Sequence, residues 1–363
     1  MNRGLATGIV GAAVLVLAAL AWRHAGGDAG PQSAAGGQGG AAAAQEAESA
    51  AATAAPADGQ PARSQPPATP PPLPSLDMPL RLAVDGLRQR ADAGDAAAAC
   101  RLAAEFERCR ALATRAEQVR PMDVFLETMA ANADDPGHVE RVQREIGERD
   151  RAWRAAAIEL EHCQGVQAPS PAERARYWRR AAMAGHVPAM RHYAIGNAFR
   201  LEDLMAAVPE LETYRHEAEQ VAVRAAAAGD LAMIHALAQA YLPRERGPEW
   251  AQENFRPFLA QVVEADARKA LEWLYALQAH PDLRGLPASH PVREFPVEHV
   301  AGLEARLPAD AIAAANGAAS ERARGWRPGQ SGPLRMTLYG NGGLDDVSRE
   351  ECERGARGWS PGA

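Results

Sequence analysis

The sequence carries little positive charge apart from arginine. Lys269 is its only lysine, and its 363 residues have a net charge of −7. Proteins that bind nucleic acids generally need a basic surface to neutralise the phosphates. Here acidic and basic residues are evenly mixed, which argues against a nucleic-acid-binding function.

The sequence also lacks the patterns of strands and of common catalytic sites. No stretch alternates apolar and polar residues with the two-residue period of a β-strand. It has no G-x-S-x-G nucleophile elbow, no phosphate-binding P-loop and no dinucleotide-binding glycine pattern. No Cys-x-x-Cys or His-x-x-x-His spacing indicates a zinc site. We therefore predict an all-α body, for which the sequence identifies no catalytic residue, cofactor or metal.

Residues 1–24 have the features of an export signal. Arg3 is followed by 19 uncharged residues, Gly4 to Trp22, enough to span a bilayer as a helix. The A-x-A form of a signal-peptide cleavage site occurs at Ala19-Leu20-Ala21. A cleaved signal peptide and a single-pass anchor in the inner membrane are both open. An anchor places the body on the periplasmic side of the inner membrane, and a cleaved signal makes it periplasmic or secreted. The absence of a following cysteine argues against a lipoprotein.

The rest of the chain divides by composition into three parts. Residues 25–76 are rich in alanine, glycine and proline and are predicted to form a disordered linker. Helical spacing of apolar residues marks the body, residues 77–325. Residues 326–363, rich in glycine, proline and arginine, are predicted to be a flexible tail. An alternative is that Trp326 and Trp359 in this tail are anchors for a partner.

Three glycines organise the helical body. Gly94, Gly185 and Gly229 each follow a run of small residues and precede a new apolar helical stretch. Glycine is favoured just beyond a helix end, where the backbone turns left-handed. Asp95 and Asp230 then stand at the position that caps the next helix. The pattern predicts pairs of helices joined by tight turns.

The second of these copies carries a family resemblance. The stretch from Ala175 to Met190, ARYWRRAAMAGHVPAM, resembles the Sel1-like branch of the tetratricopeptide-type repeats. It contains Trp178 and Gly185 in that family's pattern, whereas Leu87 and Ala222 replace the tryptophan in the other two copies. The glycine-rich loop that the family has between paired helices is missing here, and the three glycines are unevenly spaced.

The resemblance implies a helix-turn-helix repeat array that forms an α/α superhelix and binds other proteins without catalysis. It also implies that the first helix of each pair lines the concave face. On that basis we take four residues as exposed candidates for partner contact, with a merely solvated helix face as the alternative. They are Arg191, His192, His235 and Gln239.

Four cysteines in an exported chain indicate disulfides. Cys100 and Cys109 would lie on opposite sides of one helix and should not pair with each other. We favour a bridge between Cys109 and Cys163, which would stabilise the fold by roughly 4 kcal/mol in the chain-entropy model. The alternative is a metal site that includes both cysteines and His162. If Cys352 is oxidised, it ties the tail to the body or links two chains.

From these features we expect a non-enzymatic scaffold of the bacterial cell envelope that binds an unidentified protein on its concave face. One alternative is an envelope hydrolase on an α-rich scaffold, which would gather titratable side chains in a deep pocket. Another is a structural spacer whose linker does the useful work. None of the three requires a cofactor on the sequence evidence.

Overall fold

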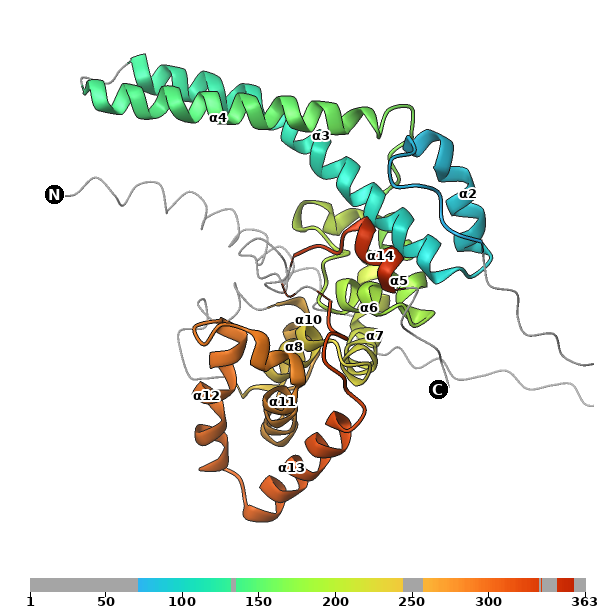
Figure 1. Ribbon diagram of the computed structural model, residues 1–363, viewed down its shortest axis with the longest axis vertical. Coiled ribbons are helices and arrows are strands. Elements are labelled where there is room, and N and C mark those ends of the chain that lie inside the picture. The colour runs from blue at the N-terminus through green and yellow to red at the C-terminus, as the bar shows by residue number, and fades with distance from the viewer. Residues whose placement is uncertain (1–70, 132–134, 244–256, 333, 335–344, 356–363) are drawn as a thin grey trace, which may run out of the picture. The chain divides into compact units, whose positions relative to one another are not determined.

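The computed structural model describes residues 71–131, 135–243, 257–332, 334 and 345–355 (Figure 1). These residues are helical with no strand, which confirms the all-α prediction. The helices are α2 (Leu80–Asp92), α3 (Ala96–Ala131), α4 (Pro136–Glu161), α5 (Pro171–Met183), α6 (Val187–Ala194), α7 (Val208–Ala227), α8 (Leu231–Tyr241), α10 (Phe258–Val262), α11 (Ala267–Ala279), α12 (Pro291–Glu304), α13 (Ala309–Ala323) and α14 (Arg349–Gly355), with 3-10 turns η1 (Leu201–Ala206) and η2 (Pro281–Gly285).

Every described residue belongs to one compact unit, residues 69–363. The predicted membrane span, from Gly4 to Trp22, therefore lies outside the described residues, as does most of the predicted linker. Within the described part of the chain, no helix is both long and apolar enough to cross a membrane.

Three glycine turns join helices into hairpins, as predicted. Gly94 joins α2 to α3, Gly185 joins α5 to α6, and Gly229 joins α7 to α8. Their φ angles of 93°, 87° and 84° lie in the left-handed region that favours glycine. Asp95 and Asp230 begin the following helices, and each accepts a backbone N–H bond of 3.0 Å three residues on. Local sequence alone explains these turns.

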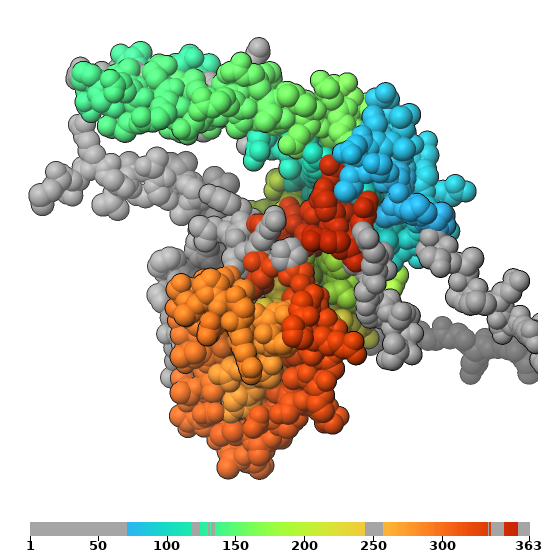
Figure 2. All heavy atoms as spheres, in the orientation of Figure 1, coloured from blue at the N-terminus to red at the C-terminus, as the bar shows by residue number. Residues whose placement is uncertain are grey.

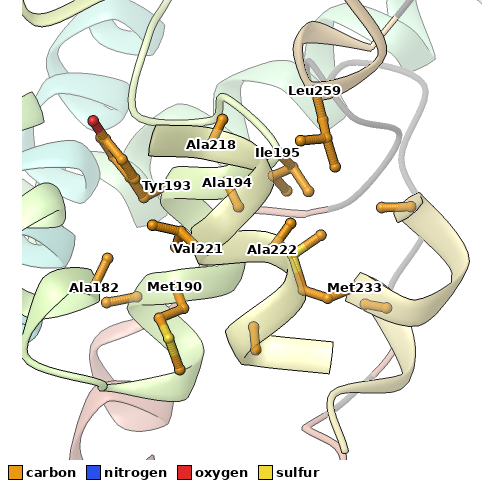
Figure 3. Close-up of a cluster of buried hydrophobic side chains, with 14 of the residues drawn as sticks. Ala182, Met190, Tyr193, Ala194, Ile195, Ala218, Val221, Ala222, Met233 and Leu259 are labelled. Atoms are coloured by element: carbon orange, nitrogen blue, oxygen red, sulfur yellow. The ribbon is translucent and has the colours of Figure 1, made fainter. Parts of the chain in front are cut away.

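The hairpins pack on one another largely in chain order. α3 contacts α5, α6 contacts α7, and α8 contacts α11, which in turn packs against α12 and α13. The core between α6, α7 and α8 is built mainly from alanine and a few larger side chains, so the helices approach closely. Figure 3 shows Met190 and Tyr193 of α6 beside Val221 and Ala222 of α7, with Met233 of α8 near them. A regular superhelical repeat array remains a prediction.

A long antiparallel hairpin fills the interval between Gly94 and Gly185. Its arms are α3, of 36 residues, and α4, of 26 residues. Toward the far end from the core, Leu126 and Val142 form a small separate apolar cluster. This hairpin explains the uneven spacing of the glycines, since it separates the first glycine turn from the second.

The described part of residues 326–363 differs from the flexible tail that we expected. Trp326 is buried, and its indole Nε1 donates a hydrogen bond of 3.2 Å to the carbonyl oxygen of Ala227. Further along, α14 packs on α3 and α6. Its Cys352 is disulfide-bonded to Cys100. Contacts with distant helices therefore order these residues, although their composition resembles that of a loop. Trp359 lies outside the described residues.

Candidate functional site

The four residues predicted to contact a partner are mostly not exposed. Arg191 and His192 lie on α6, where their exposed fractions are 5% and 0%. His235 on α8 is 7% exposed, and Gln239 on the same helix is half-buried. The prediction of an exposed face is therefore wrong for Arg191, His192 and His235. Each lies on the second helix of its hairpin, and that helix is covered by other parts of the chain.

What covers Arg191 and His192 is the C-terminal segment, defined here as residues 345–355. This segment lies against α3 and α6 (Figure 1), and Figure 2 shows it in red between the cyan and green parts of the chain. Val347 and Cys352 are its buried apolar side chains. The segment thus occupies a face that we had assigned to a partner protein.

A local signal for the helix in this segment was present in the sequence and missed. Ser348 and Glu351 form a reciprocal capping box. The Glu351 amide donates to Ser348 Oγ at 3.3 Å, and the Ser348 amide donates to Glu351 Oε2 at 3.0 Å. The spacing Ser-x-x-Glu is a known start signal for a helix. It predicts the start of α14, but not the place where α14 docks.

Two disulfides hold the first hairpin. Cys109 pairs with Cys163, which is the bridge that the sequence favoured, and Cys100 pairs with Cys352 of the C-terminal segment. Bonded sulfurs are not metal ligands, so the alternative of a metal site at Cys109 and Cys163 does not fit. His162, the third residue of that alternative, instead places its Nε2 3.1 Å from Glu105 Oε2.

Two histidines hold the backbone of the C-terminal segment. His186 Nε2 lies 2.8 Å from the carbonyl oxygen of Cys352, and the Val347 amide donates to His192 Nδ1 at 3.2 Å. Burial lowers the pKa of His186 and lowers that of His192 further. Both imidazoles are therefore neutral at pH 7. A neutral imidazole has one nitrogen that donates and one that accepts. His186 donates through Nε2 to the carbonyl oxygen of Cys352, and His192 accepts through Nδ1 from the amide of Val347.

Trp178, which we predicted to define the repeat, supports one of these histidines. The rings of Trp178 on α5 and His192 on α6 are stacked, with centroids 3.8 Å apart and planes 24° from parallel. Both side chains are fully buried. Because the tryptophan is fixed in the core, it fixes the imidazole plane and aims Nδ1 at Val347.

Three arginines of the helical body bind three carboxylates of the C-terminal segment. We call the surface formed by these arginines, His186 and His192 the docking seat. Two of the arginines are almost fully buried and the third is partly exposed. The pairs are Arg101 with Glu353, Arg191 with Glu351 at 2.5 Å, and Arg200 with Asp346 at 2.5 Å.

Each of these arginines also binds a carboxylate of the helical body itself. Charge-assisted contacts of this kind are about twice as strong as neutral hydrogen bonds. Every arginine is therefore shared between a permanent partner and a partner in the C-terminal segment. The permanent pairs are Arg101 with Glu105 at 2.8 Å, Arg191 with Asp230 at 3.1 Å, and Arg200 with Glu107 at 3.4 Å.

The pKa values of the buried charges follow from these contacts. Burial alone would lower the pKa of Arg191, but Asp230 and Glu351 outweigh it, and the pKa is raised. Burial raises the pKa of Glu107, and Arg200 and Arg174 offset that rise only in part. The raised pKa values of Arg191 and Arg200 keep both charged, which is the state that recognises carboxylates.

His235 belongs to a different environment. Its ring contacts that of Phe295 on α12, with centroids 4.7 Å apart. Burial lowers its pKa to about 4, and the neighbouring His290 and His299 add to the effect. The structure thus brings Arg191 and His192 together under the C-terminal segment and places His235 against α12.

No protein-family model, curated protein or solved structure matched this chain in our comparisons. The resemblance to Sel1-like repeats therefore rests on the residues quoted above.

Proposed function

We propose that this chain is a non-enzymatic scaffold that binds another protein on the periplasmic side of the bacterial inner membrane. In this proposal its body is a Sel1-like array of helical hairpins. Residues 1–24 export it or anchor it in the membrane, and residues 25–76 form a tether. The partner binds on the α3/α6 side of the array.

The glycine hairpins support the repeat part of the proposal. All three have the same construction, in which a left-handed glycine ends one helix and a new helix begins two residues later. Stacked units of this kind cannot bury their apolar faces singly and present extended surfaces to partners. Trp178, the residue that defines the family's pattern, is fully buried between its own helix and α6.

The observation that carries the binding function is that the docking seat already holds a peptide. The C-terminal segment is bound there through two backbone contacts and three arginine–carboxylate pairs. Recognition of backbone together with selected side chains is how repeat and peptide-binding domains commonly hold extended or helical segments. A surface that binds a segment of its own chain in this way has the chemistry to bind a segment of another.

The test is position-specific photo-cross-linking in living cells. A photoreactive residue is placed at Ala111, an exposed position of α3, which is one of the two helices that the C-terminal segment covers, and in a second variant at Val297 on α12, which is 75% exposed. We expect one envelope protein to be captured from Ala111 and not from Val297. Capture from Val297 alone would remove the α3/α6 side from the proposal. Absence of a defined partner at both positions would remove the scaffold function.

The two disulfides support the proposed compartment, because such bonds persist in the periplasm and are rare in the cytosol. The measurement is alkylation of intact cells with a maleimide that adds mass to each free thiol, with and without prior reduction. We expect the four cysteines to be modified only after reduction. Modification of all four in unreduced cells would contradict a periplasmic body.

A further inference from the structure

We infer that the docking seat is a binding site for an acidic segment of a partner protein, and that the C-terminal segment is its displaceable internal occupant. The seat becomes available when the Cys100–Cys352 bond is reduced. This inference rests on the proposed scaffold function and specifies the chemistry of the partner and the control of access.

The first argument concerns what remains when the C-terminal segment leaves. A buried arginine that loses its only partner is strongly destabilising. Here each of the three arginines keeps a carboxylate of the helical body, at 2.8 Å for Arg101, 3.1 Å for Arg191 and 3.4 Å for Arg200. Release of the segment therefore leaves no unpaired arginine in the seat. A segment that served only to complete the core would not need this second set of partners.

The second argument concerns which ligand the seat selects. The three arginines of the seat contact acids, and its two histidines contact the ligand backbone. Arg349 of the segment lies outside these contacts, with its Nη1 2.9 Å from the carbonyl oxygen of Leu76 and 3.4 Å from Glu105 Oε1. Asp346, Glu351 and Glu353 each contact an arginine of the seat. Glu350, by contrast, contacts Arg349 and Ser348 of the segment itself and no arginine of the seat in the contacts observed. The arrangement selects carboxylates at defined positions rather than negative charge in general, with apolar side chains in the places of Val347 and Cys352.

The third argument concerns access. Both sulfurs of the Cys100–Cys352 bond are buried, so the C-terminal segment must lift locally before another thiolate reaches them. A dithiol protein then reduces the bond: its two thiols become a disulfide, and Cys100 and Cys352 each take up one proton and become thiols. Two electrons and two protons pass between the partners. The covalent link that favours the internal occupant is then gone.

The test uses the full-length chain carrying Cys100→Ser and Cys352→Ser. In this protein the acids of the internal segment are also neutralised by Asp346→Asn, Glu351→Gln and Glu353→Gln. Neutralisation weakens the internal occupant, which otherwise competes at the high effective concentration of a tethered ligand. The probe is a fluorescein-labelled synthetic peptide of residues 345–355 with Cys352→Ser, and binding is followed by fluorescence anisotropy. We expect saturable binding that weakens as salt is added.

Two further peptides provide a matched control. Glu351→Gln removes an acid that contacts Arg191, whereas Glu350→Gln removes the same charge one position earlier. We expect the first change to weaken binding about tenfold and the second to leave it within about twofold, because loss of a charge-assisted contact is larger than loss of an exposed charge. Equal affinities for the two peptides would overturn acid recognition by the seat. No binding by a variant whose circular dichroism matches the parent would overturn the site itself, while cellular cross-linking still reports separately on the scaffold function.

The role of the disulfide is tested by hydrogen exchange and mass spectrometry on the oxidised wild type and the Cys100→Ser/Cys352→Ser chain. We expect amides of residues 349–355 to exchange at least tenfold faster without the disulfide, with α5, α6 and α7 unchanged. Unchanged exchange in the segment would overturn control of access by this bond. Faster exchange throughout the body would instead make the segment part of the core and overturn its displaceability.

Discussion

Cys100 and Cys352 are joined by a disulfide although they stand 252 residues apart in the sequence. This bond ties the first glycine hairpin to the last described helix. In the other bridge, Cys109 and Cys163 are 54 residues apart and enclose only the long hairpin. The two bonds therefore act on loops of very different length, which allows their contributions to be compared within one protein.

Removing the longer link should cost more stability than removing the shorter one. In the chain-entropy model the Cys100→Ser/Cys352→Ser chain loses about 5 kcal/mol of unfolding free energy, and the Cys109→Ser/Cys163→Ser chain loses about 4 kcal/mol. The measurement is urea denaturation of the oxidised proteins, followed by circular dichroism. A larger loss in the Cys109/Cys163 pair would show that local packing of the long hairpin, rather than loop length, dominates.

Two glycine substitutions should separate backbone strain from packing. Gly94 and Gly229 have φ angles of 93° and 84°, so alanine at either position costs about 1–2 kcal/mol from the left-handed backbone alone. An added Cβ at Gly94 meets nothing within 4 Å, whereas at Gly229 it lies 3.1 Å from the Trp326 ring and from Gln330. We expect Gly229→Ala to lower the unfolding free energy more than Gly94→Ala does in urea denaturation. Equal losses would mean that Trp326 moves aside without cost.

His235 should make the protein less stable as the pH falls below about 6.5. Its pKa is about 4 in the folded protein and about 6.5 when unfolded, so the unfolded chain binds the proton first. Above pH 6.5 the titration of this histidine does not lower the free energy of unfolding. Between pH 6.5 and pH 4 it lowers that free energy progressively, by up to about 3 kcal/mol. The lowered pKa values of His186, His192 and His280 add to the same trend.

The measurement is the thermal midpoint at pH 7.0 and pH 5.0. His235→Leu should reduce the difference between the two midpoints, because leucine takes up no proton. The control is His216→Leu on α7, where the histidine is exposed. An unchanged pH dependence in His235→Leu would contradict the assignment of this histidine as a buried neutral group.

The outer end of the long hairpin should open more readily than the rest of the described body. Among the described side chains there, its apolar cluster has two buried residues, Leu126 and Val142, with Val139 and Ile146 packed on them. Leu126→Ala should speed amide exchange of residues 135–146 while leaving the thermal midpoint of the body nearly unchanged, because opening here is local. Hydrogen exchange with mass spectrometry gives the first quantity and calorimetry the second. A large drop of the main thermal midpoint would show instead that the hairpin and the body unfold together.

Local sequence was enough to predict the helical hairpins. Left-handed glycine turns and aspartate caps depend on residues within a few positions of each other, so Gly94, Gly229, Asp95 and Asp230 could be assigned without a structure. Apolar spacing at the helical period likewise identified an all-α body. Ser348 and Glu351 carry the same kind of local signal for the start of α14.

The places where those helices meet depend on long-range contacts that no local pattern contains. The exposure of Arg191 and His192 depends on a segment more than 150 residues later, and no local pattern states that the segment returns to α6. The pairing of Cys100 with Cys352 has the same origin, since three-dimensional proximity and not sequence spacing selects a disulfide. Local sequence therefore predicts the helices. The pairing of arginines on α3 and α6 with carboxylates of the C-terminal segment decides that this segment covers the α3/α6 face.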